Sequence, residues 1–154
     1  MPVYLRRLST WVALTACLFP VSRAVAVDGG ATLTTHSKNL KGSITLSDAG
    51  RDRHGMKKYA YRIELSSPTC RSTFTGFADF FKRSGELTDS TYLQNGKIVK
   101  TTLFKDSNAV GTVILEIDTD SPKPGFAGAS FYTPKPVPGS CVKGEGGGID
   151  FYTW

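Results

Sequence analysis

Residues 57–82 read KKYAYRIELSSPTCRSTFTGFADFFK, two strand-like segments that meet at Pro68. In the first segment, aromatic and aliphatic residues alternate with Lys, Ala, Arg and Glu, which is the period of a β-strand with one buried face. The buried face of this strand is predicted to carry Tyr59, Tyr61, Ile63 and Leu65. The second segment, 70–81, is rich in Thr and Phe and also favours a strand. Together they predict a central pair of strands.

Short strand signals recur along the rest of the chain, at 31–36, 42–47, 91–94, 97–104, 112–120 and 149–154. Asn95-Gly96 fits a type I′ turn, because both central residues of that turn need positive φ. No amphipathic helix of useful length is present. The sequence therefore predicts an all-β fold, a single small antiparallel β-barrel or sandwich of about eight short strands. Consecutive hairpins favour the barrel.

The N-terminus has the features of an export signal. Arg6 and Arg7 precede a mostly apolar run, and the small residues at 24–26 form a signal peptidase site. We therefore expect a signal peptide at 1–26 and a single β domain at 27–154. As an alternative, residues 14–17 (LTAC) resemble a bacterial lipobox, which would make Cys17 the acylated N-terminus of a lipoprotein.

The cysteines predict one disulfide bond. The chain has three cysteines, and Cys17 is unavailable to the fold under either processing route. Cys70 and Cys141 remain, and two cysteines in an exported domain indicate a disulfide. Two free buried thiols are the alternative. A zinc site would need more Cys or His residues than the chain supplies nearby.

Charge and composition restrict the classes of partner. The full chain has 19 basic and 13 acidic residues, a formal charge of +6. The signal peptide contains three of the arginines and no acidic residue, so the mature chain has 16 basic residues against 13 acidic ones. This mild excess affects solubility and does not indicate nucleic acid. We expect another protein or an envelope component as partner, no cofactor, and no transmembrane span in the mature chain.

Five basic residues gather in the polar, Gly-containing loop 48–58. This predicted binding cluster consists of Arg51, Arg53, His54, Lys57 and Lys58. It could meet a phosphate, a lipid head group or an anionic polysaccharide. An ordinary solvated loop is the alternative.

Acidic residues supply a weak metal candidate. Glu116, Asp118 and Asp120 lie two apart, so a strand would place them on one face, where they could bind calcium. A solvated face is the alternative, because calcium ligands normally converge from a curved loop.

No catalytic motif is present, and we expect the protein not to be an enzyme. No serine lies in a Gly-x-Ser-x-Gly context. His54 could form an acid–base pair with Asp52 or Asp48, but a surface histidine in a polar loop explains it equally.

An export signal, one small β domain, one disulfide and no catalytic constellation form a plan that resembles the small periplasmic inhibitor and immunity proteins of bacteria, such as lysozyme inhibitors. The resemblance implies a secreted or periplasmic, non-enzymatic protein binder that acts through surface loops. The candidate loops are 48–58 and the Pro-bracketed segment 121–139. A barrel that carries a small apolar ligand, and an envelope-tethered lipoprotein, are the alternatives.

Overall fold

The structure is a computed structural model that describes residues 30–37, 39–81, 89–92, 95–108, 111–133, 139–142 and 147–153. The predicted signal peptide, including Cys17, lies outside these ranges, and so do residues 134–138 of the Pro-bracketed segment. In the part of the chain that is described, no helix is long and apolar enough to cross a membrane.

The described residues form an all-β fold. Its strands are β1 (Ala31–His36), β2 (Lys41–Arg51), β3 (Lys57–Ser66), β4 (Arg71–Phe80), β5 (Asp89–Tyr92), β6 (Ile98–Asn108), β7 (Gly111–Asp118), β8 (Phe126–Tyr132) and β9 (Gly147–Tyr152).

Eight of these strands close into an antiparallel barrel. The sheet order is β4-β3-β2-β1-β9-β8-β7-β6-β5, and an additional β4–β6 pairing completes the ring. Strand β5 pairs with β6 outside the ring. The predicted fold class is confirmed, and the barrel is the correct one of the two architectures. Chain neighbours pair as hairpins nearly throughout, which makes this an up-and-down barrel.

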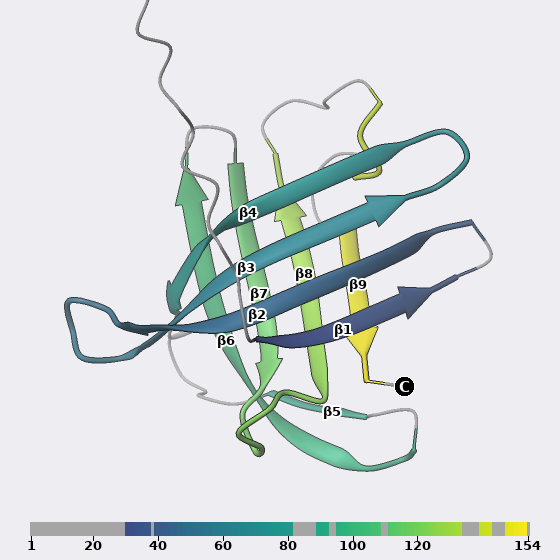
Figure 1. Ribbon diagram of the computed structural model, residues 1–154. Coiled ribbons are helices and arrows are strands. Elements are labelled where there is room, and N and C mark those ends of the chain that lie inside the picture. Colours follow the sequence, from purple (N-terminus) through teal and green to yellow (C-terminus); the bar gives the residue numbers. More distant parts are fainter. Residues whose placement is uncertain are drawn as a thin grey trace, which may run out of the picture.

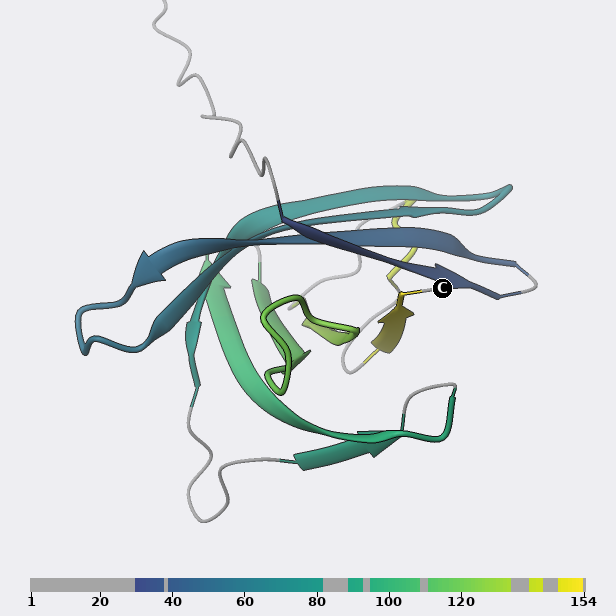
Figure 2. The same ribbon diagram turned by 60° about the horizontal axis from the view of Figure 1, so that its bottom comes forward.

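The barrel is flattened into two layers that cross at a steep angle. In Figure 1, β1 to β4 run across the front of the molecule and β6 to β9 run behind them. Figure 2 shows the strongly curved β6, which bends below the opposite layer and has β5 along its outer side. The layers are joined where β4 meets β6 and where β1 meets β9.

The barrel interior is filled by the alternating inward side chains. The predicted face of β3 is confirmed, since Tyr59, Tyr61, Ile63 and Leu65 are each at most 5% exposed. The opposite layer contributes Phe104, Leu115, Ile117, Phe131 and Phe151 to the same core. Burial of this apolar surface provides the main stabilisation of the fold.

Two hairpins are longer than the sequence indicated. Strand β2 continues to Arg51 with a register shift after Asp48, so the predicted loop 48–58 is largely strand, with a short turn at its tip. Residues 105–108, which lie beyond the end of the predicted strand 97–104, belong to β6. Both predictions were wrong for one reason: ladder hydrogen bonds do not require apolar side chains, so polar residues can extend a hairpin into solvent.

Cys70 and Cys141 form the predicted disulfide, with a Cα–Cα distance of 5.1 Å. The bond joins the start of β4 to the segment 139–142. The Ser72 hydroxyl supports it by accepting the Cys141 backbone N–H at 2.9 Å. A disulfide of this kind is typical of proteins from an oxidising, exported environment.

Replacing both cysteines by serine should lower the free energy of unfolding by about 4 kcal/mol, because the bond closes a loop with a sequence separation of 71 residues. Urea denaturation followed by circular dichroism measures this difference. Equal unfolding midpoints for the variant and the oxidised wild type would contradict the prediction.

Candidate ligand-binding cleft

The barrel wall is incomplete between β4 and β6. These strands pair only at Asp79↔Lys105 and Phe80↔Phe104, followed by one further bond from the Phe81 N–H to the Leu103 carbonyl. Over residues 71–78, β3 is the only described strand that pairs with β4. The remainder of β4 therefore diverges from the opposite layer and leaves its edge open.

A cleft of about 230 Å³ lies in this gap. Its floor is apolar and consists of Tyr61, Phe74, Val113 and Phe131. Its rim is polar and uncharged, with threonines from β4 and β7, Thr133 beyond β8, and Asn108 at the end of β6. An apolar floor with a few polar groups at the rim is the usual composition of a ligand site.

Phe74 is the least buried residue of this floor. Its ring lies 4.7 Å from the ring of Phe131, at 42° between the planes. Phe131 is 1% exposed, whereas Phe74 is only half-buried. Phe74 is thus an aromatic side chain on the inner face of the barrel that remains accessible to a ligand.

A partly buried hydrogen bond joins the two layers of the barrel beside the cleft. The Tyr61 hydroxyl donates to Asp106 Oδ2 at 2.8 Å. Burial, with further contributions from this bond and the Asp106 charge, raises the pKa of Tyr61 far above its usual value. Gly76 provides the necessary space, because an added Cβ would overlap the Asp106 carboxylate and lie 2.9 Å from the Tyr61 hydroxyl oxygen.

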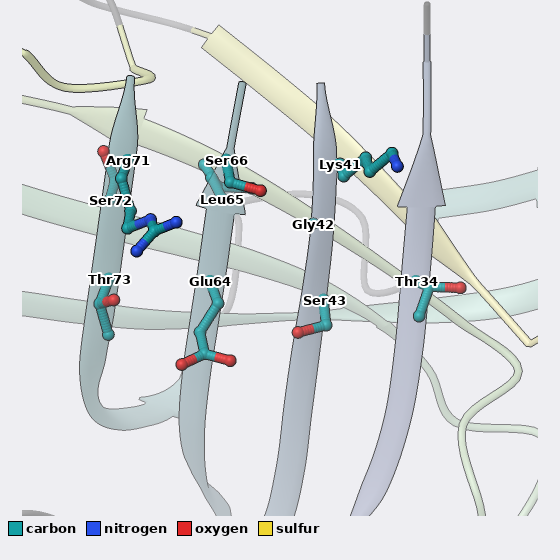
Figure 3. A pocket seen from close by; sticks show the side chains of 10 residues that line it. All are labelled: Thr34, Lys41, Gly42, Ser43, Glu64, Leu65, Ser66, Arg71, Ser72 and Thr73. Carbon is teal, nitrogen blue, oxygen red and sulfur yellow. The ribbon is translucent and has the colours of Figure 1, made fainter. Parts of the chain in front are cut away.

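A second, shallower hollow of about 430 Å³ lies on the outer face of β1 to β4 (Figure 3). It is lined mainly by hydroxyl groups and by three charged side chains, Lys41, Glu64 and Arg71. Arg62 binds the Glu64 carboxylate at 2.6 Å and so neutralises it. In Figure 3 the Arg71 guanidinium lies toward β3 while the Lys41 side chain extends toward β1, so the two cations do not converge on one anion.

The predicted basic cluster lies on the β2–β3 hairpin, which projects from the barrel (Figure 1). Arg51, Arg53 and His54 are exposed at its tip. Lys57 and Lys58 are consecutive strand residues and so face opposite sides. Lys57 lies 3.9 Å from the Asp48 carboxylate and Lys58 lies 3.1 Å from that of Asp79. The structure therefore brings together the residues at the tip and separates the two lysines.

Asp52 and His54, which were considered as an acid–base pair, form hydrogen bonds within the β2–β3 turn. Asp52 Oδ1 accepts the backbone N–H groups of Met56 and His54, at 2.9 and 2.8 Å. The bond from Met56 is the largest cause of a lowered Asp52 pKa. The His54 ring accepts a hydrogen bond from Arg53 Nε at 3.0 Å. These contacts stabilise the turn.

The acidic residues of the metal candidate also have structural partners. Glu116 accepts the Thr101 hydroxyl at 2.6 Å. Asp118 is 3% exposed and accepts the N–H groups of Asp120 and Gly125, at 2.9 and 3.1 Å, which fixes the loop after β7. The described residues include no group of three or more His, Cys, Asp or Glu side chains placed to hold a metal ion.

Sequence reasoning missed the cleft. Phe74, Val113 and Phe131 look like ordinary core residues, and nothing local indicates that β4 diverges from β6. Gly76 was the available signal, because a glycine within a strand of Thr and Phe residues often marks a close approach of another group.

The contribution of the Tyr61–Asp106 hydrogen bond to stability can be measured with the Tyr61→Phe variant. The free energy of unfolding of the variant should be about 1–3 kcal/mol lower than that of the wild type at pH 7, because the partly buried Asp106 carboxylate loses its hydrogen-bond donor. The raised Tyr61 pKa stabilises the wild type below about pH 10, the pKa of an unfolded tyrosine, and this contribution is lost as pH rises further. The variant should therefore lose less stability than the wild type between about pH 10 and pH 12.

Urea denaturation across this pH range, with Tyr132→Phe as the exposed control, measures both effects. Identical losses for Tyr61→Phe and Tyr132→Phe would show that the Tyr61–Asp106 hydrogen bond contributes nothing to stability.

The function of the cleft has to be inferred from its own shape and chemistry. No protein-family model, curated protein or solved structure matches this chain.

Proposed function

We propose that this chain is an exported, non-enzymatic binding protein whose ligand site is the cleft between β4 and the adjoining ends of β6, β7 and β8. The observation that carries the proposal is the half-buried ring of Phe74 in the apolar floor of the cleft. Leaving an aromatic surface in water costs free energy, and a ligand that covers it recovers that cost.

The size of the cleft limits what it can hold. A cavity of about 150 Å³ can bind benzene, and pockets for drug-sized ligands begin at about 300 Å³. A cleft of about 230 Å³ therefore suits one aromatic ring or one branched aliphatic group. A long lipid chain is too large for this volume, so the cleft supports the capture of a side chain or ring better than the transport of an apolar ligand.

The surrounding structure supports a preformed site. The disulfide fixes the start of β4, and the Tyr61–Asp106 bond joins the two layers beside the cleft. A rigid site binds with a smaller entropic cost than one that must first be ordered. The disulfide and the predicted signal peptide support a periplasmic or extracellular location, with release after residue 26 or a lipid anchor at Cys17 as the two routes.

The proposal is tested by nuclear magnetic resonance titration of the protein with phenol, p-cresol and indole. We expect a dissociation constant of about 1 mM, which corresponds to a binding free energy of about −4 kcal/mol. The backbone signals of Phe74, Val113 and Phe131 should shift most. Shifts confined to the outer face of β1 to β4, or no shifts at all, would contradict the proposal.

Two matched tryptophan variants identify the site. Thr133→Trp, at the rim of the cleft, should weaken binding of these compounds at least tenfold by occupying the volume. Thr34→Trp makes the same change in the outer hollow and should leave binding unchanged. Equal affinities of both variants would rule the cleft out as the site.

The hairpin tip is a second candidate surface, for anions, because Arg51 and Arg53 are exposed on a projecting element. Arg51→Glu with Arg53→Glu should elute from a heparin column at clearly lower salt than the wild type. The control, Lys57→Glu with Lys58→Glu, changes the net charge by the same amount but replaces lysines that pair with Asp48 and Asp79. It should lower the eluting salt concentration less. Unchanged elution of the arginine variant would remove the tip as an anion site.

A further inference from the structure

The hydrogen-bond pattern of β4 determines which of its backbone groups face the open edge. In an antiparallel pair, only every second residue exchanges backbone bonds with its partner strand. At the β3–β4 turn the Ser67 N–H donates to the Cys70 carbonyl at 2.9 Å. With the observed register, the β4 residues that bond to β3 are then Ser72, Phe74, Gly76 and Ala78.

The intervening residues direct their N–H and C=O groups away from β3. These residues are Arg71, Thr73, Thr75 and Phe77. The opposite end of the strand gives the same alternation independently, because Phe81 donates to Leu103 of β6 at 2.9 Å and Asp79 lies two residues earlier on the same edge. The edge that binds β6 near residue 80 is thus the one left open from 71 to 77.

Within the described part of the chain, this open edge is long and unprotected. Seven residues of strand extend over roughly 20 Å, and no described residue forms a backbone hydrogen bond with this part of the edge. Natural proteins usually protect a free edge with lysine, proline or a bulge. Here the central outward side chains are Thr73 and Thr75, which are small and uncharged, and the β3–β4 register runs without a shift.

The open edge and the cleft are parts of one surface. Thr73, Phe74 and Thr75 of β4 line the cleft directly. Asn108, Gly111 and Thr133, which come from the end of β6, the start of β7 and the residue after β8, line the same cleft. Its volume of about 230 Å³ accommodates one inserted side chain, so the edge and the cleft together suit a single extended segment.

We propose that β4 takes an extended segment of a partner protein by strand addition, with one aromatic or branched aliphatic side chain of that segment in the cleft. The backbone of the segment bonds to Thr73, Thr75 and Phe77, and its inward side chain contacts Phe74. In such complexes the main chain provides affinity and the pocket provides specificity. An acidic residue opposite Arg71 is favoured as a cross-strand pair. This inference rests on the proposed function and names its partner class.

Amide hydrogen exchange of the free protein tests the open edge. The amides of Thr73, Thr75 and Phe77 should exchange much faster than those of Phe74, Gly76 and Ala78, which bond to β3. The alternation within one strand is the internal control. Equal protection of both sets would mean that the edge is already paired, and would overturn the inference.

Binding is tested with a display library of linear eight-residue peptides selected on the full mature chain. A selected peptide should protect the amides of Thr73, Thr75 and Phe77 from exchange. N-methylation at alternate positions of the peptide should weaken binding more than tenfold, and methylation at the positions between them should have little effect. Equal effects at all positions, or protection elsewhere on the protein, would overturn the inference.

A backbone variant separates strand addition from binding in the cleft. Phe77→Pro removes one N–H from the open edge without removing a bond to β3, at a residue outside the lining of the cleft, and proline is tolerated at such edge positions. It should weaken binding of the selected peptide at least tenfold while p-cresol still binds, whereas Phe77→Leu keeps the N–H and should retain the peptide. Full peptide binding by Phe77→Pro would overturn the inference.

The single-ring compounds distinguish the failure of this inference from failure of the proposed function. If p-cresol binds the cleft and no peptide protects β4, the inference fails and the proposed function stands. If neither binds, both fail. Sedimentation that shows a dimer with protected Thr73 and Thr75 amides would assign the edge to a second copy and overturn the inference.

Discussion

The hydrogen bond between Tyr61 and Asp106 joins the two layers of the barrel beside the short seam between β4 and β6. Strand β4 pairs with β6 at only two residue positions, so the backbone hydrogen bonds there connect the two layers over only a short length. The bond spans that seam from β3 to β6 at 2.8 Å, and Gly76 lets the two side chains meet. The cleft can remain open because this contact closes the barrel beside it.

The open edge is a consequence of how the layers cross. Steeply crossed layers can share backbone hydrogen bonds only near their corners, so β4 must leave β6 beyond the corner. The disulfide then fixes the far end of β4. A strand held at both ends keeps a defined geometry while its edge stays unpaired. This combination favours binding an extended partner, because the free edge needs little ordering before it pairs.

Much of the fold could be predicted from local signals. The alternation in β3 identified its buried face, and Asn95-Gly96 identified the position of a hairpin turn, where Gly96 has a φ of 75°. The predicted type I′ geometry was wrong, because Asn95 does not have a positive φ and β5 pairs with β6 from Tyr92 and Ile98 outward. The cysteine count identified the disulfide. Polar strand ends were less predictable: Asp106 lies in a run that resembles a turn, yet its side chain faces Tyr61, which is 45 residues away in sequence. No local sequence pattern predicts that contact.

Local sequence patterns were enough to predict the all-β class, the inward face of the central strand and the pairing of Cys70 with Cys141, because each depends on alternation or on the number of residues of one kind. The three-dimensional arrangement was needed to show where the barrel closes, which edge stays open and which aromatic side chain is only partly covered at the cleft. These features depend on the crossing of two layers, which is set by contacts between strands distant in the chain. The inward pattern of β4 is the same whether its outer edge is paired or free, so only the arrangement of β6 could show that Phe74 lies beside an opening.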